Sequence, residues 1–400
     1  MQVAIVEIMD TGHTPMAEAL CRIFCSEPGN TVNVFTLESH VENLKHLSEK
    51  SPGLSFSIKS PGRSVEDFLG SIASSSFDRV YVVTMTKYFS AFARWELKCK
   101  LYLVVHNLDE WFSLSLSENI GKFVSGIAKK PDLKLFFYLI KLHFSIPSYK
   151  KRILDLVSET NGSVVVLSQS VRNEAIKLQV PFNIVVVPFC VYDPVSVSRD
   201  SDITLPLRIC VPGIVSQYRR NYLALLDLAE KQLHHYKDNF CLDFLGGIQP
   251  GNRLNDSGPV LEKAEELKQK GFNIIIHKTD FIPSEQYDKE LALSDIILGN
   301  MNVVLNRHSQ YGRTKETGLP FAMIKAAKPG IMPDNYPVPE EIISSTIRYE
   351  SYDHLGKILM GLIKDRQSVT DLQKKALKNS GFFSPEMIYK QIAAGDRSGD

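Results

Sequence analysis

The sequence predicts an α/β protein of two domains, each built on a parallel sheet covered by helices. Its 400 residues exceed what one ordinary core holds and suit two domains of roughly 100–200 residues each. Short apolar, β-branched runs alternate with longer stretches of helical period, which is the pattern of strands and crossover helices in a parallel sheet. The pattern occurs twice, on either side of a polar segment, residues 190–206, that contains two prolines.

Residues 1–190 form the first predicted domain. Its expected strands lie at 2–8, 32–36, 79–84, 101–105, 163–167 and 184–187, with helices at 15–26 and 40–49 among them. Residues 191–206 are the predicted linker, because they are polar and lack a sustained period.

Residues 207–380 form the second predicted domain, in which the strand pattern starts again. Its expected strands lie at 207–213, 241–247, 272–278, 295–300 and 330–333. Residues 381–400 are expected to add a C-terminal helix and a frayed tail, GDRSGD.

The composition is that of a folded globular protein without a strong charge. Hydrophobic residues make up 44% of the chain and charged residues 23%, which excludes disordered, collagenous and coiled-coil classes. The 46 Lys and Arg residues nearly balance the 45 Asp and Glu residues, so no overall field attracts nucleic acid. Any site for a polyanion must therefore be local.

The cysteines and the N-terminal segment both favour a cytoplasmic protein. Six scattered cysteines with no C-x-x-C pair are typical of reduced core thiols and do not suggest a disulfide framework or a zinc site. MQVAIVEIMD leads directly into a strand pattern without a basic region or cleavage site, and no window holds 18 uncharged apolar residues. We expect neither secretion nor a membrane span.

Two histidines are expected at the carboxyl ends of strands in the first domain, the edge where parallel sheets bind ligands. His13 lies in MDTGHTPMAEAL, where a strand ends and a helix begins near Pro15; it can act as a general base or only cap the helix. His106 in LYLVVHNLDEW can hydrogen-bond a substrate hydroxyl or a nearby backbone carbonyl. For Asp109 and Glu110, a role in local structure is favoured over a role in ligand binding.

The second domain opens with a strand, a turn at Gly213 and an amphipathic helix led by Arg219 and Arg220 (RICVPGIVSQYRRNYLALLDLAE). Guanidinium groups bind phosphate in a bidentate manner, and arginine is disfavoured near a helix N-terminus unless an anion is present. This segment is therefore a candidate diphosphate site, whereas a solvated charged face is the alternative.

The segment YGRTKETGLPFAMIKAAKPGIMP, residues 311–333, predicts a loop, a helix and a buried strand. Lys315, Glu316, Thr317 and Gly318 precede the apolar helix, whose N–H groups and hydroxyl cap form a cradle for phosphate. The alternative is an ordinary helix with Thr317 as its cap.

Residues 129–152 combine aromatic and aliphatic side chains with basic residues at both ends. Lys134 and Lys141 lie two helical turns apart on one face, and the segment is too short to span a bilayer. It is either a helix at the inner face of a membrane, which would make the protein peripheral, or a core helix with basic flanks.

These motifs resemble the GT-B superfamily of nucleotide-sugar glycosyltransferases, in particular family 4-like members, over nearly the whole chain. Residues 164–194 are similar to the last strand, helix and strand of the first domain of that family, and TDFIPSEQYDKELALSDIIL to the stretch that meets the nucleotide base. The resemblance implies two Rossmann-like domains facing each other across a cleft, with the acceptor on the first and the donor on the second.

By this resemblance, His13, His106 and Glu316 are the expected catalytic residues. The expected donor-binding residues are Gly12, Gly213, Arg219, Arg220, Phe281, Ile282, Tyr311, Lys315, Thr317 and Gly318. Many retaining members carry a second glutamate where this chain has Ile324, whereas GHTPM is similar to the turn that carries the base in inverting members.

The resemblance implies a hexosyltransferase that moves a sugar from a nucleotide-diphosphate-sugar donor to a glycan or lipid-linked acceptor, as in polysaccharide biosynthesis. Arginine, lysine and a helix dipole can stabilise the leaving diphosphate, so no metal ion or other cofactor is expected. A nucleotide-sugar epimerase of the same fold and a catalytically inactive glycosyltransferase-like partner protein remain alternatives.

Overall fold

The computed structural model describes residues 1–10, 14–49, 51–113, 133–193, 206–248 and 257–397, with the backbone alone described for 133–144 and 395–397. The chain divides into two compact units, Met1–Phe189 with Ile388–Asp400 and Cys190–Met387. Most of the predicted linker, residues 194–205, lies outside the described residues.

The first unit contains a seven-stranded parallel sheet in the order β3-β2-β1-β4-β5-β6-β7. Its strands are β1 Gln2–Glu7, β2 Thr31–Thr36, β3 Leu54–Ile58, β4 Arg79–Val82, β5 Lys100–Val104, β6 Ser163–Val166 and β7 Ile184–Val186. The central strand β1 is buried from Val3 to Glu7, because helices cover both faces of the sheet.

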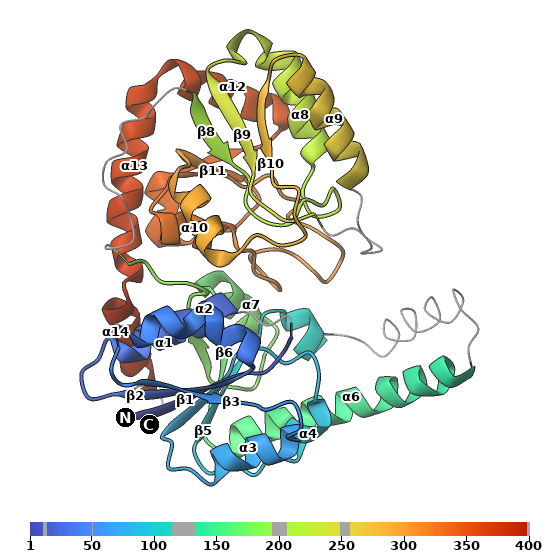
Figure 1. The fold of residues 1–400 in the computed structure, drawn as a ribbon, viewed down its shortest axis with the longest axis vertical. Helices are drawn as coiled ribbons and strands as arrows, with labels where there is room; N and C mark the ends of the chain where they lie inside the picture. Colours follow the sequence, from blue (N-terminus) through green and yellow to red (C-terminus); the bar gives the residue numbers. More distant parts are fainter. Residues whose placement is uncertain (11–13, 50, 114–132, 194–205, 249–256, 398–400) are drawn as a thin grey trace. The chain divides into compact units, whose positions relative to one another are not determined.

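Helices connect these strands and form a layer on each face of the sheet. They are α1 Thr14–Cys25, α2 Glu38–Ser48, α3 Val65–Ala73, α4 Phe89–Ala93, the π-helical turn η1 Asp109–Ser113, α6 Leu133–Glu159 and α7 Gln169–Lys177. Figure 1 shows α1 and α2 on one face and α3, α4 and α6 on the other. The final helix α14, Pro385–Arg397, also packs on this unit, where the rings of Tyr389 and Phe24 lie 6.1 Å apart.

The second unit contains a six-stranded parallel sheet in the order β10-β9-β8-β11-β12-β13. Its strands are β8 Leu207–Cys210, β9 Phe240–Phe244, β10 Asn273–Ile276, β11 Ile296–Leu298, β12 Gly330–Pro333 and β13 Thr346–Tyr349. Its α-helices are α8 Tyr222–Gln232, α9 Ser257–Gln269, α10 Ser284–Ala292, α11 Leu319–Ala326, α12 Tyr352–Lys364 and α13 Arg366–Ser380, and its 3-10 turns are η2 His234–Tyr236, η3 Glu340–Ser345 and η4 Gly381–Phe383.

The start of the second unit precedes the first strand of its sheet. Cys190 donates its thiol hydrogen to the carbonyl of Phe321, and the amide of Tyr192 donates to the carbonyl of Phe383. These hydrogen bonds attach Cys190 and Tyr192 to the second unit, whereas sequence analysis assigned Cys190 to the first domain and Tyr192 to the linker. The expected frayed tail is wrong for residues 395–397, because α14 continues to Arg397.

Each sheet reverses its strand order at one point, between β1 and β4 in the first unit and between β8 and β11 in the second. Loops that leave the carboxyl ends of the two central strands diverge there, which creates a crevice suited to a ligand. The predicted α/β class with two doubly wound, Rossmann-like domains is therefore confirmed. Sequence analysis missed the edge strands β3 and β13, whose alternating polar residues interrupt the apolar runs.

None of the six cysteines forms a disulfide bond. No helix in the described part of the chain is both long and apolar enough to cross a bilayer.

A substitution at Gly162, in the turn between α6 and β6, tests how closely this turn packs against β5. A Cβ atom added there would lie 1.9 Å from the backbone carbonyl oxygen of Leu101, whereas one added to Gly62 would meet nothing within 4 Å. We expect Gly162→Ala to lower the free energy of unfolding by about 2 kcal/mol or more, because backbone must move. Gly62→Ala should change it by less than about 1 kcal/mol. Urea unfolding followed by circular dichroism measures both, and equal midpoints would contradict this packing.

Candidate active site

The second unit places several of the predicted residues at the carboxyl edge of its sheet. The loop after β8, residues 211–221, carries Gly213, Arg219 and Arg220, and the segment after β11, residues 299–318, carries the Tyr-Gly and Lys-Glu-Thr-Gly motifs. Both follow the strands that flank the reversal of strand order. Both motifs therefore lie at the edge of the sheet where parallel-sheet proteins bind ligands.

Gly213 and Arg220 are packed against each other within the first of these loops. Gly213 adopts φ +102°, and a Cβ atom added there would lie 2.5 Å from Nη2 of Arg220. Only glycine fits this combination of backbone conformation and close contact. Asn221 then begins α8, and its side chain accepts a hydrogen bond from the amide of Ala224.

Arg220 is buried, and no described residue supplies a compensating negative charge. The residue is 9% exposed. Within the described chain, its guanidinium makes one long hydrogen bond, in which Nη1 donates to the carbonyl of Ile214 at 3.5 Å. Its Nε atom is buried with no partner there, and no described carboxylate forms an ion pair with it. A buried charge without a partner is costly to a folded protein.

The tyrosine next to Arg220 does not supply that anion. Burial raises the pKa of Tyr222 to about 12, although the charge of Arg220 acts in the opposite direction. The phenol is therefore neutral at physiological pH, and its hydroxyl donates to the carbonyl of Gly213 at 3.4 Å. Arg219, in contrast, has an exposed side chain.

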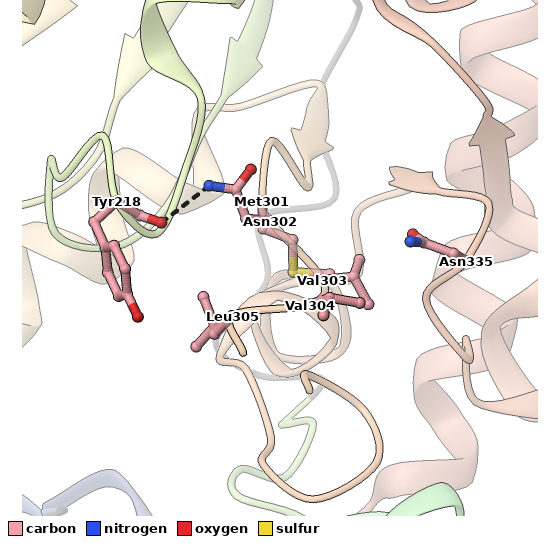
Figure 2. Close-up of a pocket in the computed structure, with 7 residues that line it drawn as sticks. All are labelled: Tyr218, Met301, Asn302, Val303, Val304, Leu305 and Asn335. Carbon is pink, nitrogen blue, oxygen red and sulfur yellow. Dashed lines mark hydrogen bonds between the residues drawn. The ribbon is translucent and has the colours of Figure 1, made fainter. Parts of the chain in front are cut away.

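Backbone hydrogen bonds attach the segment after β11 to the Arg220 loop. The amide of Asn302 donates to the carbonyl of Arg219 at 3.0 Å, and its Nδ2 donates to the carbonyl of Tyr218 at 2.9 Å, as Figure 2 shows. Farther along, the amide of buried Tyr311 donates to the carbonyl of Val303 at 2.9 Å. The backbone of Tyr311 thus holds residues 303–311 together, and its side chain is buried.

Glu316 is oriented by a tyrosine that sequence analysis missed. Its Oε1 atom accepts hydrogen bonds from the hydroxyl of Tyr336 at 2.7 Å and from the amide of Thr317 at 3.0 Å. Burial, together with the negative charge of Glu316, raises the pKa of Tyr336 well above its usual range, so the hydroxyl remains a donor. Tyr336 follows β12, and its sequence context, DNYPVP, gives no specific signal of this role.

The start of α11 differs from the prediction. Thr317 does not cap the helix: the N-cap is Gly318, which has no side chain, and Pro320 lies in the first turn. Thr317 is instead buried, so the expected hydroxyl cap is wrong. The first-turn amides consequently have no side-chain cap.

Lys315 and Ile324 differ in their surroundings. The backbone of the half-buried Lys315 hydrogen-bonds Gly312 and Gln310, whereas its ammonium group makes no hydrogen bond or ion pair with the part of the chain that the structure describes. Ile324 is 1% exposed and packs in the core, so its position on α11 contributes no polar group to a ligand.

The predicted base-binding residues lie after β10, on the same edge of the sheet. Phe281 is 71% exposed, whereas Ile282 is buried. Their segment rests on the end of β9, since a Cβ atom on Gly247 would lie 2.3 Å from the carbonyl oxygen of Asp280. Backbone of this segment is therefore fixed while the ring of Phe281 faces solvent.

In the first unit, His106 contacts a backbone carbonyl, which is the second of the two roles that the sequence allows. Its Nε2 atom lies 2.9 Å from the carbonyl oxygen of Val83 and donates its hydrogen to it. Gly12 and His13 lie outside the described residues. Glu110 accepts a hydrogen bond from Nδ2 of Asn107, in keeping with its expected role in local structure.

Sequence analysis missed a buried carboxylate at the reversal point of the first sheet. Glu7 is fully buried at the end of β1; its carboxylate accepts hydrogen bonds from the hydroxyl of Thr84 at 2.5 Å and the amide of Met9 at 3.1 Å. The one signal for it is an acidic residue that ends an apolar strand, VAIVE. It fixes the backbone at the end of β1 through the amide of Met9.

A cavity of about 500 Å³ opens beside Tyr218 in the second unit. Its other walls are residues 301–305 and Asn335, and Figure 2 shows Tyr218 and Asn335 on opposite sides of that segment. No sequence motif pointed to these residues. Within the described residues, no group of three or more His, Cys, Asp or Glu side chains could hold a metal ion.

Solved structures with the same arrangement of two parallel-sheet domains identify the fold. HepE from Anabaena in complex with UDP shares 13% identity with this chain at a TM-score of 0.61, with 100% of each chain covered. The chain has the GT-B fold. Sucrose-phosphate synthase from Thermosynechococcus elongatus also matches (12% identity, TM-score 0.54), and the match covers 100% of this chain and 98% of the synthase chain. A match to an O-GlcNAc transferase mutant from Thermobaculum terrenum (10% identity, TM-score 0.54) covers 100% of this chain and 67% of the transferase chain.

This GT-B chain is matched by structure and not by sequence. No protein-family model matches it, and a search of curated proteins finds no match.

The uncompensated charge of Arg220 predicts an unusual effect on stability. We expect Arg220→Met to raise the free energy of unfolding of the unliganded protein by about 1 kcal/mol, because a thioether of similar length removes an unpaired buried charge. Exposed Arg219→Met should change it by less than about 0.5 kcal/mol. Thermal and urea unfolding measure both. A loss of stability in Arg220→Met would show that the native contacts already satisfy the guanidinium.

Proposed function

We propose that this chain is a glycosyltransferase that moves a hexose from a nucleotide-diphosphate-sugar donor to a glycan or lipid-linked acceptor. The observation that carries the proposal is the buried guanidinium of Arg220, which has no described counter-ion at the ligand-binding edge of the second sheet. A diphosphate supplies the missing charge and suits the fork of donors on arginine.

The solved structures support the choice of ligand. HepE, which the chain matches over its full length, was solved with UDP and with UDP-glucose. We therefore extend to this chain a nucleotide-sugar donor, with its diphosphate at Arg220 and its base at Phe281 and Ile282.

The proposed reaction transfers the sugar between two oxygen atoms. The bond from the anomeric carbon to the diphosphate oxygen breaks, and its electron pair leaves with the diphosphate. Arg220, Lys315 and the uncapped first turn of α11 stabilise that developing charge, so the proposed step needs no metal ion. A hydroxyl oxygen of the acceptor forms the new bond to the anomeric carbon.

The remaining predicted residues act on the sugar and on the acceptor. Glu316, oriented by Tyr336, accepts hydrogen bonds from sugar hydroxyls. His13 takes the proton of the acceptor hydroxyl, and His106 contacts the sugar. Contact of residues 129–152 with the inner face of a membrane belongs to the same proposal, because it would bring a lipid-linked acceptor to the first unit.

Donor binding is tested by thermal shift and calorimetry with the diphosphates of uridine, guanosine, adenosine and cytidine and their sugars. We expect one base to stabilise the wild-type protein, and Arg220→Met to weaken that binding about tenfold or more, because charge-assisted hydrogen bonds are lost. Arg366→Met is the matched control. Arg366 also has unpartnered buried nitrogen atoms, but it contacts Asn239 at the opposite edge of the sheet, so its loss should leave affinity unchanged.

The products then separate the three functions. Transfer of the sugar to an added glycan or lipid-linked acceptor supports the proposal, whereas isomerisation of the donor without an acceptor would identify an epimerase. Absence of binding to every nucleotide in the panel would contradict both enzymes and favour the inactive partner protein.

A further inference from the structure

We propose that the cavity bounded by Tyr218, residues 301–305 and Asn335 is a subsite for an uncharged sugar ring. This inference rests on the proposed function and adds to it the class of sugar. It assigns the ring to residues that no sequence motif indicated.

The chemistry of the walls matches a neutral sugar. The lining contains one aromatic ring, four aliphatic or thioether side chains and two amides, but no acidic, basic or imidazole group. A pyranose presents C–H groups on its faces and hydroxyl groups around its edge, so it needs this mixture of apolar surface and a few polar groups. A charged sugar would lose its hydration in this cavity without gaining an ion pair.

The apolar walls are unusually open to solvent. Tyr218, after β8, is 45% exposed, and Val304, after β11, is 53% exposed. A ring that covers them removes apolar surface from water. The flat face of Tyr218 gives such a ring a rigid platform at low cost in side-chain entropy.

The polar walls retain unused hydrogen-bonding capacity. The amide of Asn335 is exposed and makes no hydrogen bond with the described residues. Asn302 donates one hydrogen bond to the carbonyl of Tyr218, and no described group uses its Oδ1 atom. An amide offers both a donor and an acceptor, which suits hydroxyl groups that do both.

The wall between these amides is already formed. Val304 forms a β-bridge with Gln310, and the amide of Leu305 donates to the carbonyl of Ser309 at 3.0 Å. Together with the bonds of Asn302 and Tyr311, this holds the backbone of 301–305 on both sides. A rigid cavity loses little conformational entropy when a ligand enters.

Hydrogen bonds attach one wall of the cavity to the loop that carries Arg220, the residue proposed to bind the diphosphate. Tyr218 lies two residues before Arg220, and Asn302 hydrogen-bonds the backbone of both Tyr218 and Arg219. In a nucleotide-diphosphate sugar the ring is attached directly to the diphosphate, and in the reaction an acceptor sugar must approach the same anomeric carbon. Either sugar can therefore supply the ring that occupies this subsite.

Calorimetry with UDP, UDP-glucose and UDP-glucuronate tests the subsite, or the corresponding set if the panel selects another base. We expect the wild-type protein to bind the glucose donor more tightly than the glucuronate donor. Tyr218→Ala and Asn335→Ala should each weaken the glucose donor about fivefold and leave the nucleoside diphosphate within about twofold. Phe382→Ala is the matched control, because Phe382 in η4 is also 45% exposed and lies outside the cavity.

Saturation-transfer NMR with methyl glucoside and maltose identifies the source of the ring. If the two variants leave donor affinity unchanged but reduce saturation of these free sugars, the subsite holds the acceptor, and the proposal stands. If the wild-type protein binds no nucleotide but still binds the sugars at Tyr218 and Asn335, the proposed function fails while the sugar subsite remains.

Three results would overturn the subsite. Equal weakening of the nucleoside diphosphate and its sugar by Tyr218→Ala would show that the cavity holds the base. A preference for glucuronate would contradict the uncharged ring. No effect of either variant on donor or free sugar would show that the cavity holds no sugar.

Discussion

The arrangement of the second unit depends on the guanidinium of Arg220, which is buried and has no carboxylate beside it in the described chain. Several local features follow from this placement. Gly213 must be glycine because its backbone adopts φ +102° where the guanidinium of Arg220 approaches it, and Asn221 caps the helix that begins directly after the arginine. Asn302 then ties the neighbouring segment to the same loop. A site that keeps an unpaired charge loses stability for the sake of binding, as functional sites often do.

The order of strands explains why these groups meet. Arg220 and Glu316 are almost a hundred residues apart, but their segments leave the two strands on either side of the reversal in the second sheet. The first unit repeats the arrangement, with buried Glu7 at the end of β1 hydrogen-bonded to Thr84 after β4. Parallel topology thus gathers polar groups at one edge of each sheet, and the apolar remainder of each strand holds that edge in place.

The sequence predicted the features that arise from local pattern. Apolar runs located the central strands, and the arginine pair and the Lys-Glu-Thr-Gly motif located the edge of the second sheet. The edge strands β3 and β13 were missed because a strand that is buried on fewer sides tolerates polar residues such as Ser55 and Arg348. The exact start of α11 at Gly318 was missed because the threonine before it was the better cap by propensity.

The remaining site residues could not be predicted because their roles come from tertiary contact. Tyr336 reaches Glu316 only through the turn after β12, and Asn335 reaches the cavity from that same turn. Neither residue lies in a motif, and neither the orphaned Nε of Arg220 nor the exposure of Tyr218 can be read from composition or period.

The central claim is that Arg220 awaits an anionic ligand, and its own NMR signal tests this most directly. In protein labelled with ¹⁵N-arginine, the Nε–H resonance of Arg220 is identified by its absence in Arg220→Lys and followed during titration with UDP and with inorganic pyrophosphate. The account predicts a saturable shift and slower hydrogen exchange of this signal when either anion binds. Binding of UDP that shifts other signals and leaves this one unmoved would contradict the account.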